Sequence, residues 1–375
     1  MRIAYFNTIR AFGGGEKRVI QGTRDLRGLG HSVTVFCRRG SALEERCRAE
    51  EVNCEPLEVG SYVSWPRAVQ LRELFAKHRL DCVICFDQRA VRLAALARRL
   101  TPSNESSPSI VYYYGGERTF RNVWYNRQVV APAIERYVPN AAALRDELLS
   151  FGWIPSDRIE VIYDGLDPRP ILAADPAGVR EELGADPRDL VVITVARLVE
   201  GKGHDALIRA AAPLLTPYPG LRLWLAGDGP LLPSLQELAR ASGLGDRVQF
   251  LGFRKDVPRL LRAANILCHP SRKEGAPNAV REGMAAGLPV AAVAASGTPE
   301  LIDVGETGYL SPIDDVPSLS ANLARLLEDA SLRVRLGEAG KRKALAEFGE
   351  EICTSRWLTL LEGCANHRES SSRVR

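Results

Sequence analysis

Residues 191–207, VVITVARLVEGKGHDAL, combine a short apolar run, a loop with two cations and two glycines, and the start of a helical pattern. The run 191–195 is short and rich in β-branched residues, which is typical of a buried strand. The loop that follows carries Arg197 and Lys202 and ends at Gly203. Cations at the carboxyl end of a strand favour an anion site over a solvated surface. The stretch therefore predicts one strand–loop–helix unit of an α/β sheet.

The same alternation of strand and helix runs along the whole chain and predicts parallel sheets covered by helices. We expect strands at 3–6, 32–37, 81–86, 109–114, 191–196, 221–226, 248–252, 265–269 and 289–293. We expect helices at 17–29, 67–79, 88–100, 204–214, 230–242, 257–263, 277–286, 317–329, 331–347 and 350–364, followed by a frayed polar tail at 366–375. The segment 163–187 is rich in proline and glycine, which indicates a linker between two open α/β domains.

Composition excludes several classes of protein. No apolar run approaches the ~18 residues that a membrane span needs, and the apolar stretch 3–6 is too short for a signal peptide. We therefore expect a cytoplasmic protein. The eight cysteines are scattered and are expected to be buried free thiols, and no two of the five histidines have metal-ligand spacing. A net charge of +4 is too small to indicate a nucleic-acid partner.

Glycine-containing loops follow two further strands. The run Gly13–Glu16 comes after the first strand and leads into a helix that we expect to begin at Glu16 or Lys17. Free N–H groups at that helix terminus could bind a phosphate, although an ordinary flexible loop fits equally well. Asp228 lies between Gly227 and Gly229, where it could line a base or sugar pocket or belong to a tight turn.

The stretch 271–282, SRKEGAPNAVRE, is the most informative motif. Proline suits the first helical position, so the helix is expected to begin at Pro277, with the N–H groups of residues 275–278 available to an anion. Glu274 and Glu282 are eight residues apart, about 12 Å if the spacing is helical. Each carboxylate can accept hydrogen bonds from a pair of vicinal hydroxyls on either side of the anion. The alternative is a helix with an ordinary solvated glutamate.

The order of these motifs, together with FLGF at 250–253, resembles the retaining glycosyltransferases of family 4. The resemblance implies the GT-B fold, in which two Rossmann-like domains face one another across a cleft. The resemblance implies an N-terminal acceptor-binding domain at 1–168, a donor-binding domain at 169–352, and a C-terminal helix that crosses back at 353–375. It implies that Arg197 and Lys202 hold the donor diphosphate, that Glu274 contacts the donor sugar, and that Glu282 binds the ribose. The other expected nucleotide contacts are Gly14, Gly15, Gly227, Asp228, Phe253, Gly275, Ala276, Pro277 and Asn278.

By the same resemblance, the reaction is hexosyl transfer from a nucleotide diphosphosugar, UDP- or GDP-linked, to a carbohydrate, lipid-linked or small-molecule hydroxyl, with retention. Cations would stabilise the leaving diphosphate, so neither a metal nor another cofactor is expected. The residue that meets the acceptor is expected among Tyr114, Glu117 and Arg118, with Glu117 as our choice. Asp164 stands where the family usually has asparagine.

Other functions remain open at this stage. A non-hydrolysing sugar-nucleotide 2-epimerase would use the same fold and a similar donor cleft, and a non-catalytic nucleotide-sugar binding protein would keep the same cleft without turnover. The first half also contains many arginines, with Trp124 and Tyr125 near the last of them. Such a surface could hold the protein against the anionic inner face of a membrane, or could be ordinary solvated helix surface.

Overall fold

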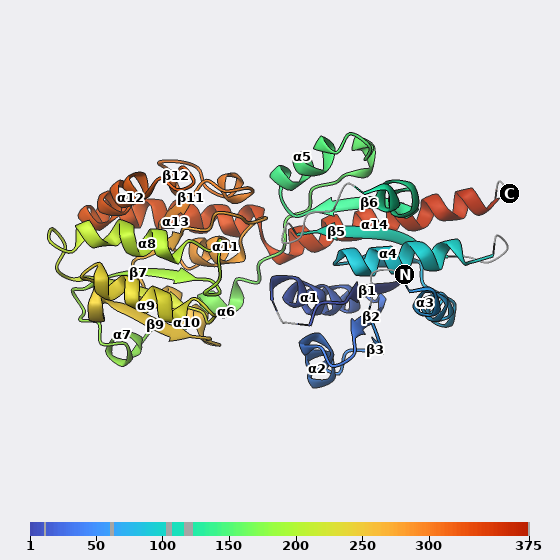
Figure 1. Cartoon of the computed structure of the whole chain (residues 1–375), viewed down its shortest axis with the longest axis horizontal. Coiled ribbons are helices and arrows are strands. Elements are labelled where there is room, and N and C mark those ends of the chain that lie inside the picture. Colours follow the sequence, from blue (N-terminus) through green and yellow to red (C-terminus); the bar gives the residue numbers. More distant parts are fainter. Residues whose placement is uncertain (11–12, 61–63, 103–106, 116–122, 374–375) are drawn as a thin grey trace. The chain divides into compact units, whose positions relative to one another are not determined.

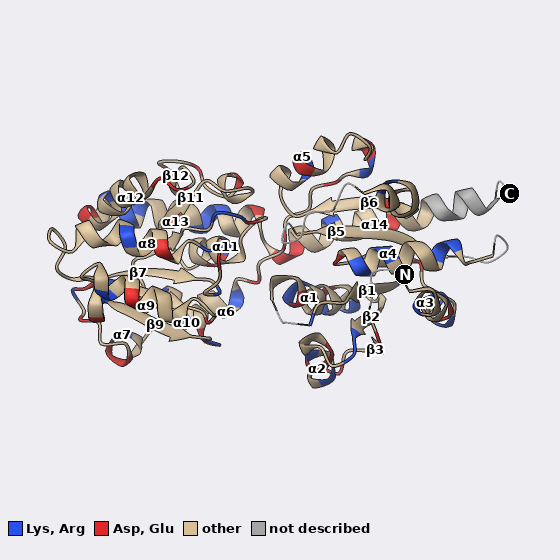
Figure 2. Cartoon of the chain, viewed as in Figure 1, with Lys and Arg blue, Asp and Glu red and all other residues tan. Residues whose placement is uncertain are grey.

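The computed structural model describes residues 1–375 except 11–12, 61–63, 103–106, 116–122 and 374–375 (Figure 1). The chain divides into two compact units, Met1–Asp164 with Glu351–Arg375, and Gly165–Glu350. The domain boundaries inferred from the sequence, after residues 168 and 352, lie four and two residues later than these. Figure 2 shows Lys and Arg interspersed with Asp and Glu on the helices of both units.

The first unit is built on a parallel sheet of six strands in the order β3-β2-β1-β4-β5-β6. The strands are β1 (Arg2–Asn7), β2 (Ser32–Arg38), β3 (Cys54–Leu57), β4 (Cys82–Cys85), β5 (Ser109–Tyr114) and β6 (Ile134–Pro139). Its helices are α1 (Gly14–Gly28), α2 (Ala42–Ala49), α3 (Trp65–Lys77), α4 (Gln88–Arg99), α5 (Ala142–Ser150) and α14 (Glu350–Arg373). The sequence analysis missed β3 and β6, because both are edge strands that contain proline and charged residues.

The second unit repeats the plan, with the strand order β12-β11-β10-β7-β8-β9. The strands are β7 (Leu190–Val195), β8 (Leu221–Ala226), β9 (Val248–Gly252), β10 (Ile266–His269), β11 (Val290–Val293) and β12 (Gly308–Ser311). The helices are α6 (Arg169–Leu172), α7 (Val179–Glu182), α8 (His204–Ala211), α9 (Leu232–Ala241), α10 (Val257–Ala263), α11 (Asn278–Ala285), α12 (Val316–Glu328) and α13 (Ala330–Glu347). The expected two-sheet α/β architecture is confirmed, with β12 as an additional, partly buried edge strand.

The C-terminal helix belongs to the core of the first unit. Trp357, Leu360 and Leu361 of α14 are buried in the same apolar cluster as Ile3 of β1 and Val19 of α1. The helix is assigned through Arg373, nine residues beyond the end at residue 364 that the sequence predicted. An apolar face that packs on the sheet stabilises a helix more than propensity alone.

The segment expected to be a linker is partly folded onto the second unit. It contains the short helices α6 and α7, whose residues Ile171 and Val179 are buried. Close to where the chain enters this unit, the Leu166 N–H donates to the carbonyl of Phe348 at 2.8 Å, and the Glu350 N–H donates to the carbonyl of Leu166 at 3.1 Å. The segments that enter and leave the second unit are therefore paired as a short β-bridge.

Candidate functional site

The strand order of the second unit places four polar loops at one edge of its sheet. β10, β7, β8 and β9 are consecutive neighbours and run parallel, so their carboxyl ends share that edge. The motifs that the sequence analysis identified separately follow these four strands. They are residues 271–278, 196–203, 227–230 and 253–254.

A part-buried ion pair joins the loops after β7 and β10. The Lys202 Nζ lies 2.8 Å from Oε1 of Glu274, and the two side chains are only 18% and 15% exposed. Nε2 of His269, the last residue of β10, lies 3.4 Å from the same carboxylate oxygen. The two loops are also joined by the backbone, since the Arg272 N–H donates to the carbonyl of Gly201 at 2.7 Å. Two of the predicted site residues thus contact one another directly.

Glu274 is held in its ionised form. Burial alone would raise its pKa, but the imidazole of His269 and the ammonium of Lys202 outweigh burial and lower the pKa to about 2. A carboxylate that stays charged at neutral pH can accept hydrogen bonds but cannot act as a general acid. The sequence analysis had set His269 aside as one of five scattered histidines. Its position at the end of a strand, five residues before Glu274, was the available signal.

Gly203 allows the cationic loop to lie close to the loop after β10. Its φ is +71°, and a Cβ atom at this position would lie 1.9 Å from the carbonyl oxygen of Pro270. Any larger residue would force the two backbones apart. Arg272, which the sequence analysis did not assign, is ion-paired with Asp205 and Asp314 at 2.9 and 2.6 Å. Arg272 therefore ties this loop to the start of α8.

Helix α11 begins at Asn278, with Pro277 as its N-cap, so the predicted start at Pro277 was one residue early. Glu282 is consequently the fifth helical residue, about 6 Å along the axis from Asn278. The 12 Å estimate from Glu274 does not apply, because half of that spacing is loop. Arg281 is buried, donates to the carbonyl of Ala276 at 3.1 Å, and also donates to the side-chain oxygen of Asn278. This buried cation orders the helix start and was missed from the sequence.

The other two loops are linked to the cationic loop through the backbone. The Leu198 N–H donates to the carbonyl of Asp228 at 2.7 Å, and the Gly227 N–H donates to that of Gly252 at 2.9 Å. Phe253 is 71% exposed, which leaves its ring accessible to a flat ligand. Arg254 is instead ion-paired with Asp256 and Glu182. The expected donor-side residues thus lie on connected loops.

In the first unit, Gly14 and Gly15 lie in the first turn of α1, which begins at Gly14. The predicted start at Glu16 or Lys17 was wrong, because the Glu16 side chain caps the helix from inside its first turn. Its carboxylate is buried and accepts from the Gly13 N–H and from Nδ2 of Asn7, each at 2.8 Å.

The predicted acceptor-side residues are only partly within the described structure. Glu117 and Arg118 lie outside the described residues. Tyr114 is buried in β5, and its hydroxyl donates to Glu147 at 3.0 Å.

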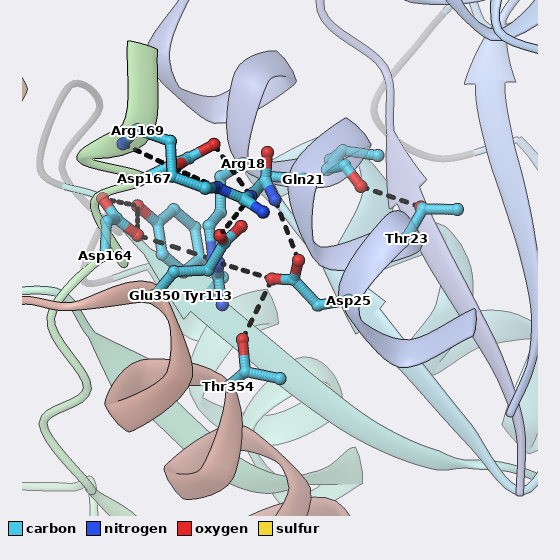
Figure 3. A network of polar contacts seen from close by, with 11 residues as sticks. Arg18, Gln21, Thr23, Asp25, Tyr113, Asp164, Asp167, Arg169, Glu350 and Thr354 are labelled. Atoms are coloured by element: carbon cyan, nitrogen blue, oxygen red, sulfur yellow. Dashed lines mark hydrogen bonds and ion pairs between the residues drawn. The ribbon is translucent and has the colours of Figure 1, made fainter. Parts of the chain in front are cut away.

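Asp164 is the last residue of the first unit before the chain enters the second unit. A buried polar network holds its side chain (Figure 3). Its carboxylate accepts from the hydroxyl of Tyr113 and from Nδ2 of Asn140 at 2.9 Å, and it lies 3.9 Å from the guanidinium of Arg18. Arg18 is 6% exposed, and its guanidinium lies 5.9 Å from the ring centre of Trp357. A buried cation therefore accompanies the aspartate at the position where the resemblance led us to expect asparagine.

The structure also bears on metal and membrane binding. Among the described side chains, no three or more His, Cys, Asp or Glu are arranged to hold a metal ion. Over the same described ranges, no helix is both long and apolar enough to span a bilayer.

Comparison with known proteins agrees with this architecture. The chain superposes on a glycosyltransferase from Rickettsia africae ESF-5 with a TM-score of 0.86 and 18% identity, covering 97% of this chain and 98% of that one. It superposes on Anabaena Alr3699/HepE in complex with UDP with a TM-score of 0.85 and 22% identity, covering 97% of this chain and 100% of that one. The fold is therefore that of the GT-B glycosyltransferases.

Two family models match consecutive parts of the chain. "Glycosyltransferase Family 4" matches residues 12–169, and "Glycosyl transferases group 1" matches residues 178–343. The chain belongs to glycosyltransferase family 4. A curated relative, the lipopolysaccharide core biosynthesis glycosyltransferase LpsE of Rhizobium meliloti, is 31% identical over 60% of this chain and 63% of its own length. The chain thus spans less than two thirds of that relative.

Proposed function

We propose that this protein is a retaining glycosyltransferase that moves a hexose from a UDP- or GDP-sugar to a hydroxyl acceptor. The observation that carries the proposal is the Lys202–Glu274 ion pair, which joins a cationic loop to an acidic loop at the carboxyl edge of the second sheet. A diphosphosugar needs both kinds of group, because its diphosphate is anionic and its sugar is a set of hydroxyls. The structural neighbour Alr3699/HepE has been solved in complex with UDP-glucose, which supports a UDP-sugar donor.

We assign the donor diphosphate to Lys202, Arg197 and the N-terminus of α11. An ammonium has three N–H groups, and Glu274 accepts one of them, so two remain for phosphate oxygens. The free N–H groups of the first turn of α11 and the guanidinium of Arg197 add positive charge around the same anion. As the bond to the sugar breaks, negative charge grows on the leaving diphosphate, and these fixed charges stabilise it.

Glu274 acts on the sugar as a hydrogen-bond acceptor. Its pKa of about 2 keeps it anionic, so it can orient two hydroxyls of the donor sugar without giving up a proton. Glu282 would accept from the ribose, and Phe253 would pack against the base. Retention then requires no protein nucleophile, because the leaving phosphate takes the proton of the acceptor hydroxyl on the same face of the sugar.

We further propose that the acceptor is part of a cell-surface polysaccharide, lipopolysaccharide, glycolipid or secondary metabolite, and that transfer takes place in the cytoplasm at the inner face of the membrane. The lipopolysaccharide-core assignment of the relative LpsE supports this class of acceptor. Trp65 and Trp124 in the first unit are 61% and 72% exposed, and tryptophan is favoured at membrane interfaces.

A thermal-shift screen of UDP-, GDP-, ADP- and TDP-sugars tests the donor assignment. A donor at 100 times its dissociation constant stabilises the folded protein by about 2.7 kcal/mol, without added metal. The stabilising donor is then incubated with and without acceptors, and the products are analysed by NMR. Transfer with retained configuration supports the proposal. Inversion at C2 in the absence of an acceptor would identify an epimerase, and binding without turnover would identify a binding protein. Absence of a shift with every donor would refute the proposed site.

A further inference from the structure

Three cysteines form a cluster in the first unit, away from the loops described above. Cys37 lies in β2, Cys47 in α2 and Cys54 in the edge strand β3. Cys54 is paired in register with Val35, so Cys54 and Cys37 are diagonal neighbours on one face of the sheet. Their sulfur atoms are 3.0 Å apart. All eight cysteines of the chain are free thiols, as the sequence analysis expected.

The three thiols differ in their access to solvent. Cys37 and Cys47 are fully buried in the apolar cluster of this unit, whereas Cys54 is half-buried at its margin. A small oxidant in solution therefore reaches Cys54 first. Among the eight cysteines, this is the one that is not buried. The expectation that all of the cysteines are buried was therefore wrong for Cys54.

The surroundings of Cys54 favour its thiolate. The sulfur of Cys54 is hydrogen-bonded to that of Cys37, and the neighbouring thiols of Cys37 and Cys47 lower the pKa of Cys54 while their own pKa values are raised. The charge of Arg48 acts in the same direction, while burial and the carboxylate of Glu44 oppose it. Glu44 is itself ion-paired with Arg48, which reduces its effect. Thiolate character together with exposure is what makes a cysteine reactive toward peroxide.

We propose that Cys54 and Cys37 are a peroxide-oxidisable thiol pair, with Cys54 as the attacking thiol and Cys37 as the resolving thiol. The sulfur of Cys54 attacks one oxygen of hydrogen peroxide. The S–O bond forms, the O–O bond breaks, and the released hydroxide takes a proton and leaves as water. The sulfur of Cys37 then attacks the sulfur of the Cys54 sulfenic acid, forming the S–S bond. The hydroxyl leaves with the Cys37 proton as a second water. Two thiols are oxidised for one peroxide reduced.

The position of Cys54 makes this closure feasible. The two sulfur atoms must approach by about 1 Å to reach the S–S bond length of ~2.05 Å. β3 is only four residues long and has a neighbour on one side only, so it can move toward β2 without breaking a central strand. Cys47 also influences the pKa of Cys54, but it lies on a helix rather than on the paired strand.

The test uses the full chain. The protein is first reduced, the reductant is removed, and hydrogen peroxide is then added. Remaining thiols are alkylated under denaturing conditions, and the protein is digested with trypsin. Arginines at positions 38, 46 and 48 place the three cysteines on separate peptides. We expect a cross-link between peptides 28–38 and 49–67 that dithiothreitol reverses. Cys54 should be oxidised at least ~10-fold faster than the buried Cys85.

Single variants separate the roles within the cluster. Cys37→Ser should stop the reaction at a Cys54 sulfenic acid that dimedone traps, and Cys54→Ser should leave Cys37 reduced. Cys47→Ser is the matched control, because it removes a neighbouring thiol and should keep the cross-link. Circular dichroism checks the fold of each variant. A cross-link from Cys54 to Cys47, oxidation of Cys54 beyond the sulfenic acid without any cross-link, or equal rates for Cys54 and Cys85 would overturn the proposal.

Discussion

Replacing Lys202 with methionine tests the ion pair at the centre of the site. The change keeps an apolar, unbranched stem of similar length and removes the ammonium that lies 2.8 Å from Glu274. Opposite charges about 4 Å apart attract by ~4 kcal/mol at an effective dielectric constant near 20, and most of this is offset by desolvation. We therefore expect a net loss of about 1–3 kcal/mol in stability, because a largely enclosed carboxylate remains without its ammonium partner.

We expect these variants to lose more turnover than their loss of stability alone would explain. Removing one group that stabilises charge in a transition state typically costs about 100- to 1000-fold in turnover. We expect a loss of at least ~100-fold for Lys202→Met and for Glu274→Gln, measured as kcat with the donor that the thermal-shift screen identifies. Lys202→Arg is the control that retains the charge. Thermal unfolding of each variant shows whether the fold is kept. In a unit of this size, each kcal/mol of lost stability lowers the melting temperature by about 2–4 °C.

The double variant, with both Lys202→Met and Glu274→Gln, tests whether the two residues act together. If the ion pair makes them one unit, the double variant loses little more activity than either single variant, about 100- to 1000-fold. Two independent residues would instead show multiplied losses of about 10,000-fold. Multiplied losses, or near-normal turnover in either single variant, would refute the reasoning that assigns this pair to the donor diphosphosugar.

Further predictions concern the same loops and the first unit. Gly203→Ala should lower both stability and turnover, because its Cβ would meet a backbone carbonyl at 1.9 Å; Gly243→Ala, also at positive φ but with open space, should cost only about 1 kcal/mol in thermal unfolding. The depressed pKa of Glu274 contributes about 3 kcal/mol that is present above pH ~4.5 and is lost as the pH falls toward 2. Lys202→Met should therefore move acid unfolding, followed by circular dichroism, to higher pH, and an unchanged midpoint would contradict the assigned cause. Arg18→Met should destabilise the protein by about 3–5 kcal/mol in thermal unfolding, because buried carboxylates lose their cation; a loss below ~1 kcal/mol would show that the network contributes little.

Local features of the chain were sufficient for much of the fold. Buried central strands are short apolar runs between turn residues, so β1, β4, β7 and β10 could be predicted from their own residues. The loops that carry Lys202 and Glu274 could also be identified, because each directly follows such a strand. Edge strands such as β3 and β12 lack this signal, since one side of each is open and their residues are mixed.

Contacts between distant residues were decided by the tertiary structure. Lys202 and Glu274 meet because β7 and β10 are neighbours in the sheet, and strand order depends on packing across the whole unit rather than on either loop. Tertiary structure also places His269 beside Glu274, so a histidine to which the sequence analysis gave no role belongs to the site. Amino-acid type and spacing along the chain thus indicate which side chains could take part in binding or catalysis. Which charges come within 3–4 Å of one another depends on the strand order of the second sheet, and the free energy that fixes this order comes from packing the whole unit rather than from any single segment.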